Sequence, residues 1–169
     1  VMAEGFPDRM KPDFQNTTQV LVDHKRFGQK TGSGFYRYEP GRRDALHDAV
    51  VDDVVDACRR EAGITPRRIA DGEIVQRCIY ALVNEGARIL EEGIAQRPGD
   101  IDVIWVYGYG FPAWRGGLMY YADQVGLPRI RDRLTEFARI TGDRKLEPAP
   151  LLVNLANEGR GFGSLNKKD

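Results

Sequence analysis

Two pairs of adjacent carboxylates, Asp52-Asp53 and Glu91-Glu92, have the chemistry for general acid–base work in this sequence. Such work needs an acid and a base positioned on a reacting group. Both pairs fall in stretches with helical periodicity, where neighbouring acidic residues most often form a solvated face. We therefore expect a surface role for both pairs and assign no catalytic residue to them.

The two histidines and two cysteines are the remaining candidates for metal binding or nucleophilic catalysis. His24 and His47 are separated by an expected loop and linker, and neither Cys58 nor Cys78 has a second soft ligand nearby in the sequence, so a zinc site would need an unusual convergence. The sequence has no G-x-G-x-x-G after a strand, no P-loop and no G-x-S-x-G nucleophile elbow. We expect no metal site, no cofactor site and no catalytic residue in this chain.

The segment from Trp105 to Tyr121 is distinctive because large aromatic residues alternate with glycines there. The period-two pattern of its first half would also fit a strand. The rings either fill a core between two helices or form one wall of a pocket for a flat, apolar ligand. We expect Trp105 and Phe111 to be core rings, and we expect Trp114 and Arg115 to face a ligand or a neighbouring domain.

Four glycines in this segment, Gly108, Gly110, Gly116 and Gly117, lie among the large rings. Glycine is favoured where φ is positive or where a Cβ would not fit. We expect such positions among these four.

Composition excludes several classes of protein. Twenty-five basic residues balance 25 acidic ones among the 169 residues, so the formal charge is zero and nucleic acid or an anionic membrane is a poor partner. No apolar run is long enough to span a membrane, and the first residues do not resemble a secretory signal. Two cysteines suit a reducing compartment, so we expect a cytoplasmic protein.

Apolar residues recur at helical spacing through most of the chain, which predicts an all-α fold. One predicted helix buries a stripe that includes Val50, Val51 and Cys58. Another, with Asp71 as N-cap, places Ile74 and Cys78 on its buried face, together with Ala81, Leu82, Glu85 and Ile89. The glycine-rich residues 26–38 are expected to form a loop that packs through its aromatic residues. The predicted helices cover residues 13–26, 46–61, 71–93, 98–108, 118–125, 128–138 and 150–157.

The two ends of the chain echo one another. Residues 20–28 resemble residues 151–163, which is what a duplicated helical unit would produce. On so few residues chance explains the echo equally well. The residues after Val1 read as the end of a helix, so we expect this chain to be a piece of a longer protein.

Several segments together resemble the C-terminal region of 3-hydroxyacyl-CoA dehydrogenases. The resemblance is strongest to the multifunctional fatty-acid oxidation proteins that fuse an enoyl-CoA hydratase to that dehydrogenase. It covers nearly the whole chain, and the segments occur in the family's order. Besides the aromatic segment, they are Phe27–Tyr36, Glu73–Cys78, Ala81–Gly93 and Pro98–Asp102.

The resemblance implies a helical domain of the 6-phosphogluconate dehydrogenase C-terminal type and a division of the chain. In the family, an N-terminal Rossmann domain binds NAD and supplies the catalytic His–Glu pair, and multifunctional members carry two helical repeats behind it. Residues 1–40 would be the tail of the first repeat with its glycine-rich loop, and 41–47 a linker. Residues 48–163 would be the second repeat, and 164–169 a tail.

By the same resemblance, this chain is the non-catalytic C-terminal part of an NAD-dependent (3S)-3-hydroxyacyl-CoA dehydrogenase of β-oxidation. The family's active-site Asn lies upstream of Val1, whereas Asn84 and Glu85 are implied to serve packing and helix-end bonding. The chain would complete the acyl-CoA cleft and support domain packing or dimerisation. NAD would bind only in the full-length enzyme, and the partners would be its own Rossmann and hydratase domains, acyl-CoA and a second copy. The candidates for substrate or domain contact are Trp114, Arg115 and Lys30.

An alternative interpretation remains open. The chain could be a free-standing helical module that binds an apolar ligand or a partner helix through residues 105–121. The sequence upstream of Val1 separates the two hypotheses, because a Rossmann fingerprint there supports the first and a start codon supports the second.

Overall fold

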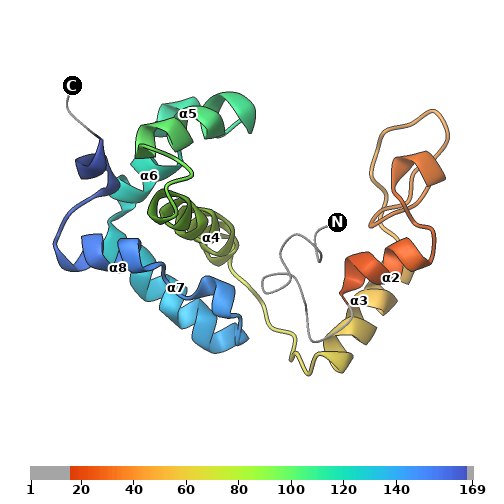
Figure 1. Ribbon diagram of the computed structural model, residues 1–169. Helices are drawn as coiled ribbons and strands as arrows, with labels where there is room; N and C mark the ends of the chain where they lie inside the picture. Colours follow the sequence, from red (N-terminus) through yellow and green to blue (C-terminus); the bar gives the residue numbers. More distant parts are fainter. Residues whose placement is uncertain (1–15, 167–169) are drawn as a thin grey trace. The chain divides into compact units, whose positions relative to one another are not determined.

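The computed structural model describes residues 16–166, which fall into two compact units divided between Arg68 and Ile69 (Figure 1). Every regular element in this range is a helix, and strand pairing is limited to isolated bridges. The predicted all-α fold is therefore confirmed. The expected helix end in the first seven residues lies outside the described residues.

The first unit contains two α-helices that pack on each other, α2 (Thr17–Asp23) and α3 (Ala49–Glu61). Asn16 and Asp48 cap them, since each side chain accepts a hydrogen bond from a first-turn N–H. In residues 16–68, the buried hydrophobic residues are Leu21, Val51 and Cys58.

A glycine-rich loop joins these two helices through a short 3-10 turn, η1 (Gln29–Thr31). The loop folds back on itself so closely that a Cβ on Gly34 would lie 2.7 Å from the Cα of Gly28. Arg26 holds it in place: its Nε donates to the carbonyl of Gly34 at 3.1 Å, and its Nη2 lies 2.5 Å from Oδ2 of Asp48. One arginine thus joins the loop to the start of α3.

The second unit is built around the longest helix, α4 (Asp71–Glu91), which packs against α5, α6, α7 and α8 (Figure 1). The other elements are α5 (Pro98–Gly108), η2 (Ala113–Arg115), α6 (Leu118–Val125), α7 (Leu127–Thr141), η3 (Arg144–Leu146), α8 (Pro150–Asn157) and η4 (Phe162–Leu165).

All of these elements except the two short turns η2 and η3 contribute fully buried residues to one core. Gly86 lets α4 and α6 approach, because a Cβ there would lie 2.7 Å from Sδ of Met119. The core side chains include Val83, Ala87, Leu118, Met119, Ile130, Leu134, Leu152 and Phe162.

Two helical starts in this unit are capped by aspartates from other helices. The residues before α6 and η4 are Gly117 and Gly161, which have no side chain to accept the free first-turn N–H groups. Asp102 accepts from the N–H of Met119 at 2.6 Å, and Asp123 accepts from those of Phe162 and Gly163 at 2.7 and 2.8 Å. These helical starts therefore depend on tertiary packing.

The start of α8 is held in the same way by α4. Asn84, the one buried polar residue in the described part of the chain, accepts from the N–H of Ala149 at 2.7 Å and donates to the carbonyl of Glu147 at 2.9 Å. Glu91 accepts from the N–H of Leu151 at 2.6 Å. The packing and helix-end bonding that the resemblance implied for Asn84 is what the structure shows.

The structure corrects several details of the predicted helices. The buried face of α4 carries Tyr80, Val83, Asn84 and Ala87, whereas Ile74 and Cys78 are exposed. The predicted face is correct for Leu82 and Ile89, which pack against the core, and wrong for Ile74 and Cys78 at the start of the helix. Three further details differ from the prediction. Val50, expected on the buried stripe of α3, is 51% exposed. Asp71 is the first residue of α4 and not its N-cap, and α7 begins one residue before Pro128.

Other expectations concern boundaries. Gly63 and Gly93 follow α3 and α4 with positive φ, a conformation that is common for the glycine after a helix end. The segment that could have been a strand is helical up to Gly108. The expected linker, residues 41–47, lies inside the first unit, and the proposed repeat boundaries stay a prediction.

No helix in residues 16–166 is both long and apolar enough to cross a bilayer.

We predict that Asn84→Ala destabilises the second unit strongly. The change leaves the N–H of Ala149 without its partner in a buried place, which costs about 1–3 kcal/mol, and the lost packing adds to that. Urea unfolding measures the effect. The matched control Asn154→Ala, at an exposed position of α8, should stay within about 0.5 kcal/mol. Equal stabilities of the two variants would contradict the role assigned to Asn84.

Candidate interaction site at the end of α5

A chain of aromatic contacts connects the end of α5 to the turn before α6. The ring of Trp105 lies 6.4 Å from that of Phe111, which in turn lies 6.2 Å from that of Tyr121, both in edge-to-face orientation. The N–H of Phe111 also donates to the carbonyl of Trp105 at 2.9 Å. These contacts bring the chain after α5 back toward the core.

Trp105 and Phe111 are only half-buried. Both pack against the core cluster, but neither belongs to its fully buried set. The expectation that they are core rings is therefore correct for their contacts and too strong for their burial. They lie at the edge of the core because α5 ends nearby and leaves one side of each ring open.

Trp114 and Arg115 lie at the outer end of this chain of rings. Trp114 is 77% exposed. The guanidinium of Arg115 lies 4.2 Å from the Trp114 ring centroid and 5.3 Å from that of Tyr121. Such stacking restricts the arginine while its N–H groups can still donate to an anion.

Two consecutive glycines set the direction of this turn. Gly116 and Gly117 have φ of 76° and 106°, and Gly110 has a φ of 72°, as expected for this segment. A Cβ on Gly117 would lie 2.4 Å from Cβ of Asp102, so this glycine also makes room for the cap of α6. Gly108, by contrast, is an ordinary helical residue.

Asp102 is the acidic group with an altered pKa at this site. Burial raises the pKa of Asp102 above its ordinary value, and the nearby Asp123 carboxylate acts in the same direction. The hydrogen bonds from the N–H groups of Met119 and Tyr120 lower it and only partly offset the burial. Because both oxygens face backbone donors, Asp102 serves the helix start.

Lys30, the third candidate, belongs to the first unit, where it lies in η1 on an exposed surface. Trp114 and Arg115 belong to the second unit. The structure thus brings Trp114 and Arg115 together in the second unit, and a role for all three residues in one site stays a prediction.

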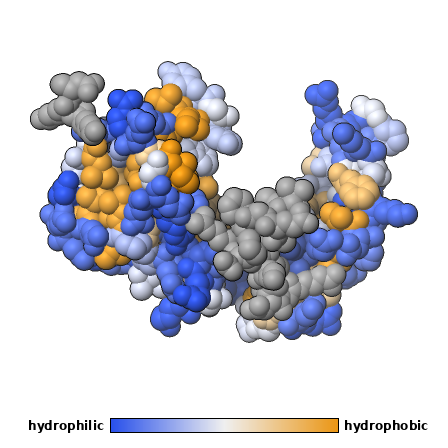
Figure 2. All heavy atoms as spheres, in the orientation of Figure 1, coloured by the Kyte–Doolittle hydropathy of each residue, from blue (hydrophilic) through white to orange (hydrophobic). Residues whose placement is uncertain are grey.

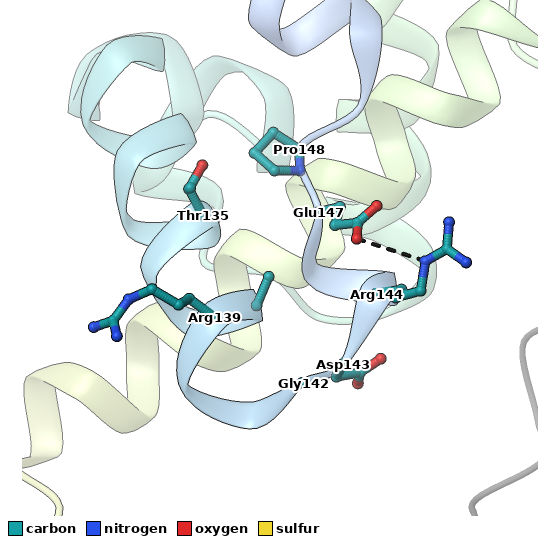
Figure 3. Close-up of a pocket in the computed structure, with 8 residues that line it drawn as sticks. Thr135, Arg139, Gly142, Asp143, Arg144, Glu147 and Pro148 are labelled. Atoms are coloured by element: carbon teal, nitrogen blue, oxygen red, sulfur yellow. Dashed lines mark ion pairs between the residues drawn. The ribbon is translucent and has the colours of Figure 1, made fainter.

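A hollow of about 410 Å³ lies elsewhere, between the C-terminal half of α7 and the connection to α8 (Figure 3). Three of its charged groups are used locally: Arg144 and Glu147 form an ion pair with Nε and Oε1 3.6 Å apart, and Asp143 accepts from the N–H of Lys145. Neither histidine nor cysteine lines it. The lining residues are Thr135, Ala138, Arg139, Gly142, Asp143, Arg144, Glu147 and Pro148.

The acidic pairs of the sequence are exposed, as expected. Asp52 lies 2.8 Å from Nε2 of His47, and Glu91 has the additional capping role at α8 that the sequence did not reveal. In residues 16–166, no group of three or more His, Cys, Asp or Glu side chains is arranged to hold a metal ion.

The helical core and the aromatic turn define the class of protein. Residues 72–167 match the family model of the 3-hydroxyacyl-CoA dehydrogenase, C-terminal domain, and the chain belongs to this family.

Among similar proteins, the peroxisomal bifunctional enzyme of Danio rerio is 49% identical over 142 residues, which is 83% of this chain and 20% of the relative. The fatty acid oxidation complex subunit alpha of Psychrobacter arcticus is 39% identical over 162 residues, which is 96% of this chain and 22% of the relative. The chain thus spans about a fifth of the length of the curated relatives it matches.

A crystal structure of the dehydrogenase part of multifunctional enzyme 1 from C. elegans has a similar fold. The TM-score is 0.64 at 25% identity, and the match covers 90% of this chain and 35% of that one. The resemblance drawn from the motifs is thus confirmed.

Sequence reasoning missed Asp102 and Asp123 as polar residues that join the helices, whereas the resemblance had implied such a role for Asn84. Position 161 offered a signal, since a glycine before a helical start cannot cap it and therefore requires an acceptor from elsewhere. The sequence could not show which side chain supplies the acceptor.

We predict that protonation of the buried Asp102 carboxylate makes the folded protein relatively more stable as the pH falls. Because its folded pKa is raised, the folded state binds a proton more tightly than the unfolded state does. The unfolding free energy of the native protein minus that of Asp102→Asn should therefore rise as the pH falls from 7 toward the ordinary aspartate pKa of about 3.9. Urea unfolding across this range measures it. Asn loses one of the two acceptor oxygens at every pH, so the pH dependence of the difference isolates the charge. A difference that shrinks with falling pH would contradict the assignment.

We predict that truncating the half-buried rings of Trp105 and Phe111 lowers the stability of the fold, whereas truncating the exposed ring of Trp114 does not. Trp105→Ala and Phe111→Ala should each cost about 3 kcal/mol, the low end for an aromatic residue truncated in a core, because both rings are half-buried. Trp114→Ala should stay within about 0.5 kcal/mol. Thermal melts of the three variants decide this. Three midpoints equal to that of the native chain would overturn the core-edge assignment.

Proposed function

We propose that this chain is the non-catalytic C-terminal part of an NAD-dependent (3S)-3-hydroxyacyl-CoA dehydrogenase of fatty-acid β-oxidation. The observation that carries the proposal is the family match over residues 72–167. Relatives named as a bifunctional enzyme and as a fatty acid oxidation subunit support the same reaction and pathway. In the full-length protein, the two units would help to complete the acyl-CoA cleft and support the packing of the catalytic domain or a dimer.

The catalytic steps would belong to the preceding part of the polypeptide. Binding of the NAD pyrophosphate uses a glycine-rich turn between a strand and a helix, and the residues described here, which include no regular strand, do not fit that group. We therefore assign no cofactor step to them. Their contribution is to hold helices rigidly through Asn84, Asp102 and Asp123, so that a surface is presented to the other domains.

Two finer points belong to the same proposal. A fused enoyl-CoA hydratase domain is supported by the bifunctional relatives. The cytoplasmic location expected from the sequence stays a prediction, since one group of similar proteins is named as peroxisomal. The similarity to parts of longer enzymes favours this function over a free-standing module.

We predict that the full-length polypeptide reduces NAD with (3S)-3-hydroxybutyryl-CoA and that this chain alone does not. The reason is that the sequence has no glycine-rich fingerprint for the pyrophosphate, and we assign the base that takes the proton of the 3-hydroxyl to the preceding domain. The absorbance of NADH measures both samples. Activity of the isolated chain above blank would overturn the non-catalytic role, and an inactive full-length enzyme would overturn the proposed reaction.

A further inference from the structure

Helix α5 is apolar on both of its sides. Its inner side packs against the core through Ile101 and Trp105. Its outer side exposes Val103, Ile104 and Tyr107, which are 57%, 56% and 86% accessible. Figure 2 shows hydrophobic side chains at the surface over α5. A helix that is apolar all round is normally covered all round.

The apolar surface continues into the turn after α5. Tyr109, 72% exposed, lies 5.1 Å from Trp105 between ring centroids. Trp105 leads through Phe111 and Tyr121 to the stacked pair Trp114 and Arg115. We call Val103, Ile104, Tyr107, Tyr109, Trp114 and Arg115 together the α5 face. Trp, Tyr and Arg are the residue types that most often dominate binding interfaces.

The charge of the α5 face is as informative as its apolar character. The only charged residues of α5, Asp100 and Asp102, lie near its start, where Asp100 pairs with Arg97 and Asp102 caps α6. Arg115 is the one charged member of the face, and within residues 16–166 its guanidinium contacts aromatic rings and no carboxylate. A complementary surface would be apolar and would carry one carboxylate for Arg115.

We propose that the α5 face docks an apolar, carboxylate-bearing surface on the preceding part of the same full-length polypeptide. This inference rests on the proposed function, since the relatives are about four times as long as this chain. A covalently attached partner has a high effective concentration, so a face of this modest size suffices for stable docking. A rigid turn, with Gly116 and Gly117 in positive-φ conformations, presents Trp114 and Arg115 in one direction.

Cysteine labelling tests the proposal. Val103→Cys is introduced into the isolated chain and into the full-length enzyme, both with the exposed Cys78 replaced by serine, and the rate of reaction with a maleimide is measured. We expect the rate to be at least about tenfold lower in the full-length enzyme. The matched control Ile140→Cys, at a 48% exposed position of α7, should react equally in both samples.

Three outcomes would overturn the proposal. Equal Val103→Cys rates in both samples would show that the face stays open. Protection that depends on enzyme concentration would identify a second copy as the occupant, and equal protection of Ile140→Cys would show general occlusion. Dehydrogenase activity of the same full-length sample is measured alongside, so an inactive enzyme with a protected face would contradict the proposed reaction alone.

A charge reversal at Arg115 tests whether the partner surface carries a carboxylate. Arg115→Glu should restore most of the Val103→Cys labelling in the full-length enzyme because it places two negative charges together. The control Arg139→Glu makes the same charge change at an exposed position of α7 and should leave the protection intact. If Arg115→Glu also leaves it intact, the partner surface carries no carboxylate at that point.

Discussion

The second unit depends on one requirement: at α6, α8 and η4 the free N–H groups of the helical start must find acceptors, and the residues before these three elements do not supply them. Gly117, Ala149 and Gly161 have no side-chain oxygen. Asp102, Asn84 and Asp123 from other helices accept instead. Because each acceptor reaches its helix only when the core is packed, helix formation and tertiary packing become one cooperative event.

This arrangement also explains the glycines. A Cβ on Gly117 or Gly161 would lie within 2.4 to 2.7 Å of an aspartate side chain, so the same position that removes a local cap makes room for the distant one. At α6, the glycine pair also turns Trp114 and Arg115 outward. The same turn thus makes room for the Asp102 cap of α6 and carries Trp114 and Arg115 of the proposed docking surface.

Much of the fold could be predicted from the sequence, because helical periodicity, prolines at helix starts and glycines at helix ends are local signals. The family could be identified from motifs such as Phe27–Tyr36 and Pro98–Asp102. The buried face of α4 could not be predicted from helical periodicity, since Asn84 is polar. Its hydrogen-bond partners are three backbone groups more than sixty residues away in the sequence. Trp114 is exposed, and the expectation that Trp114 and Arg115 face a ligand or a neighbouring domain stays a prediction.

Native-state hydrogen exchange by NMR tests the dependence of helix starts on tertiary packing most directly. The amide protons of Met119, Ala149 and Phe162, each bonded to a side chain of another helix, should exchange only through global unfolding, with the same free energy as Val83 in the middle of α4. Fast exchange of these three amides while Val83 stays protected would show that the helix starts open locally, which would contradict the account.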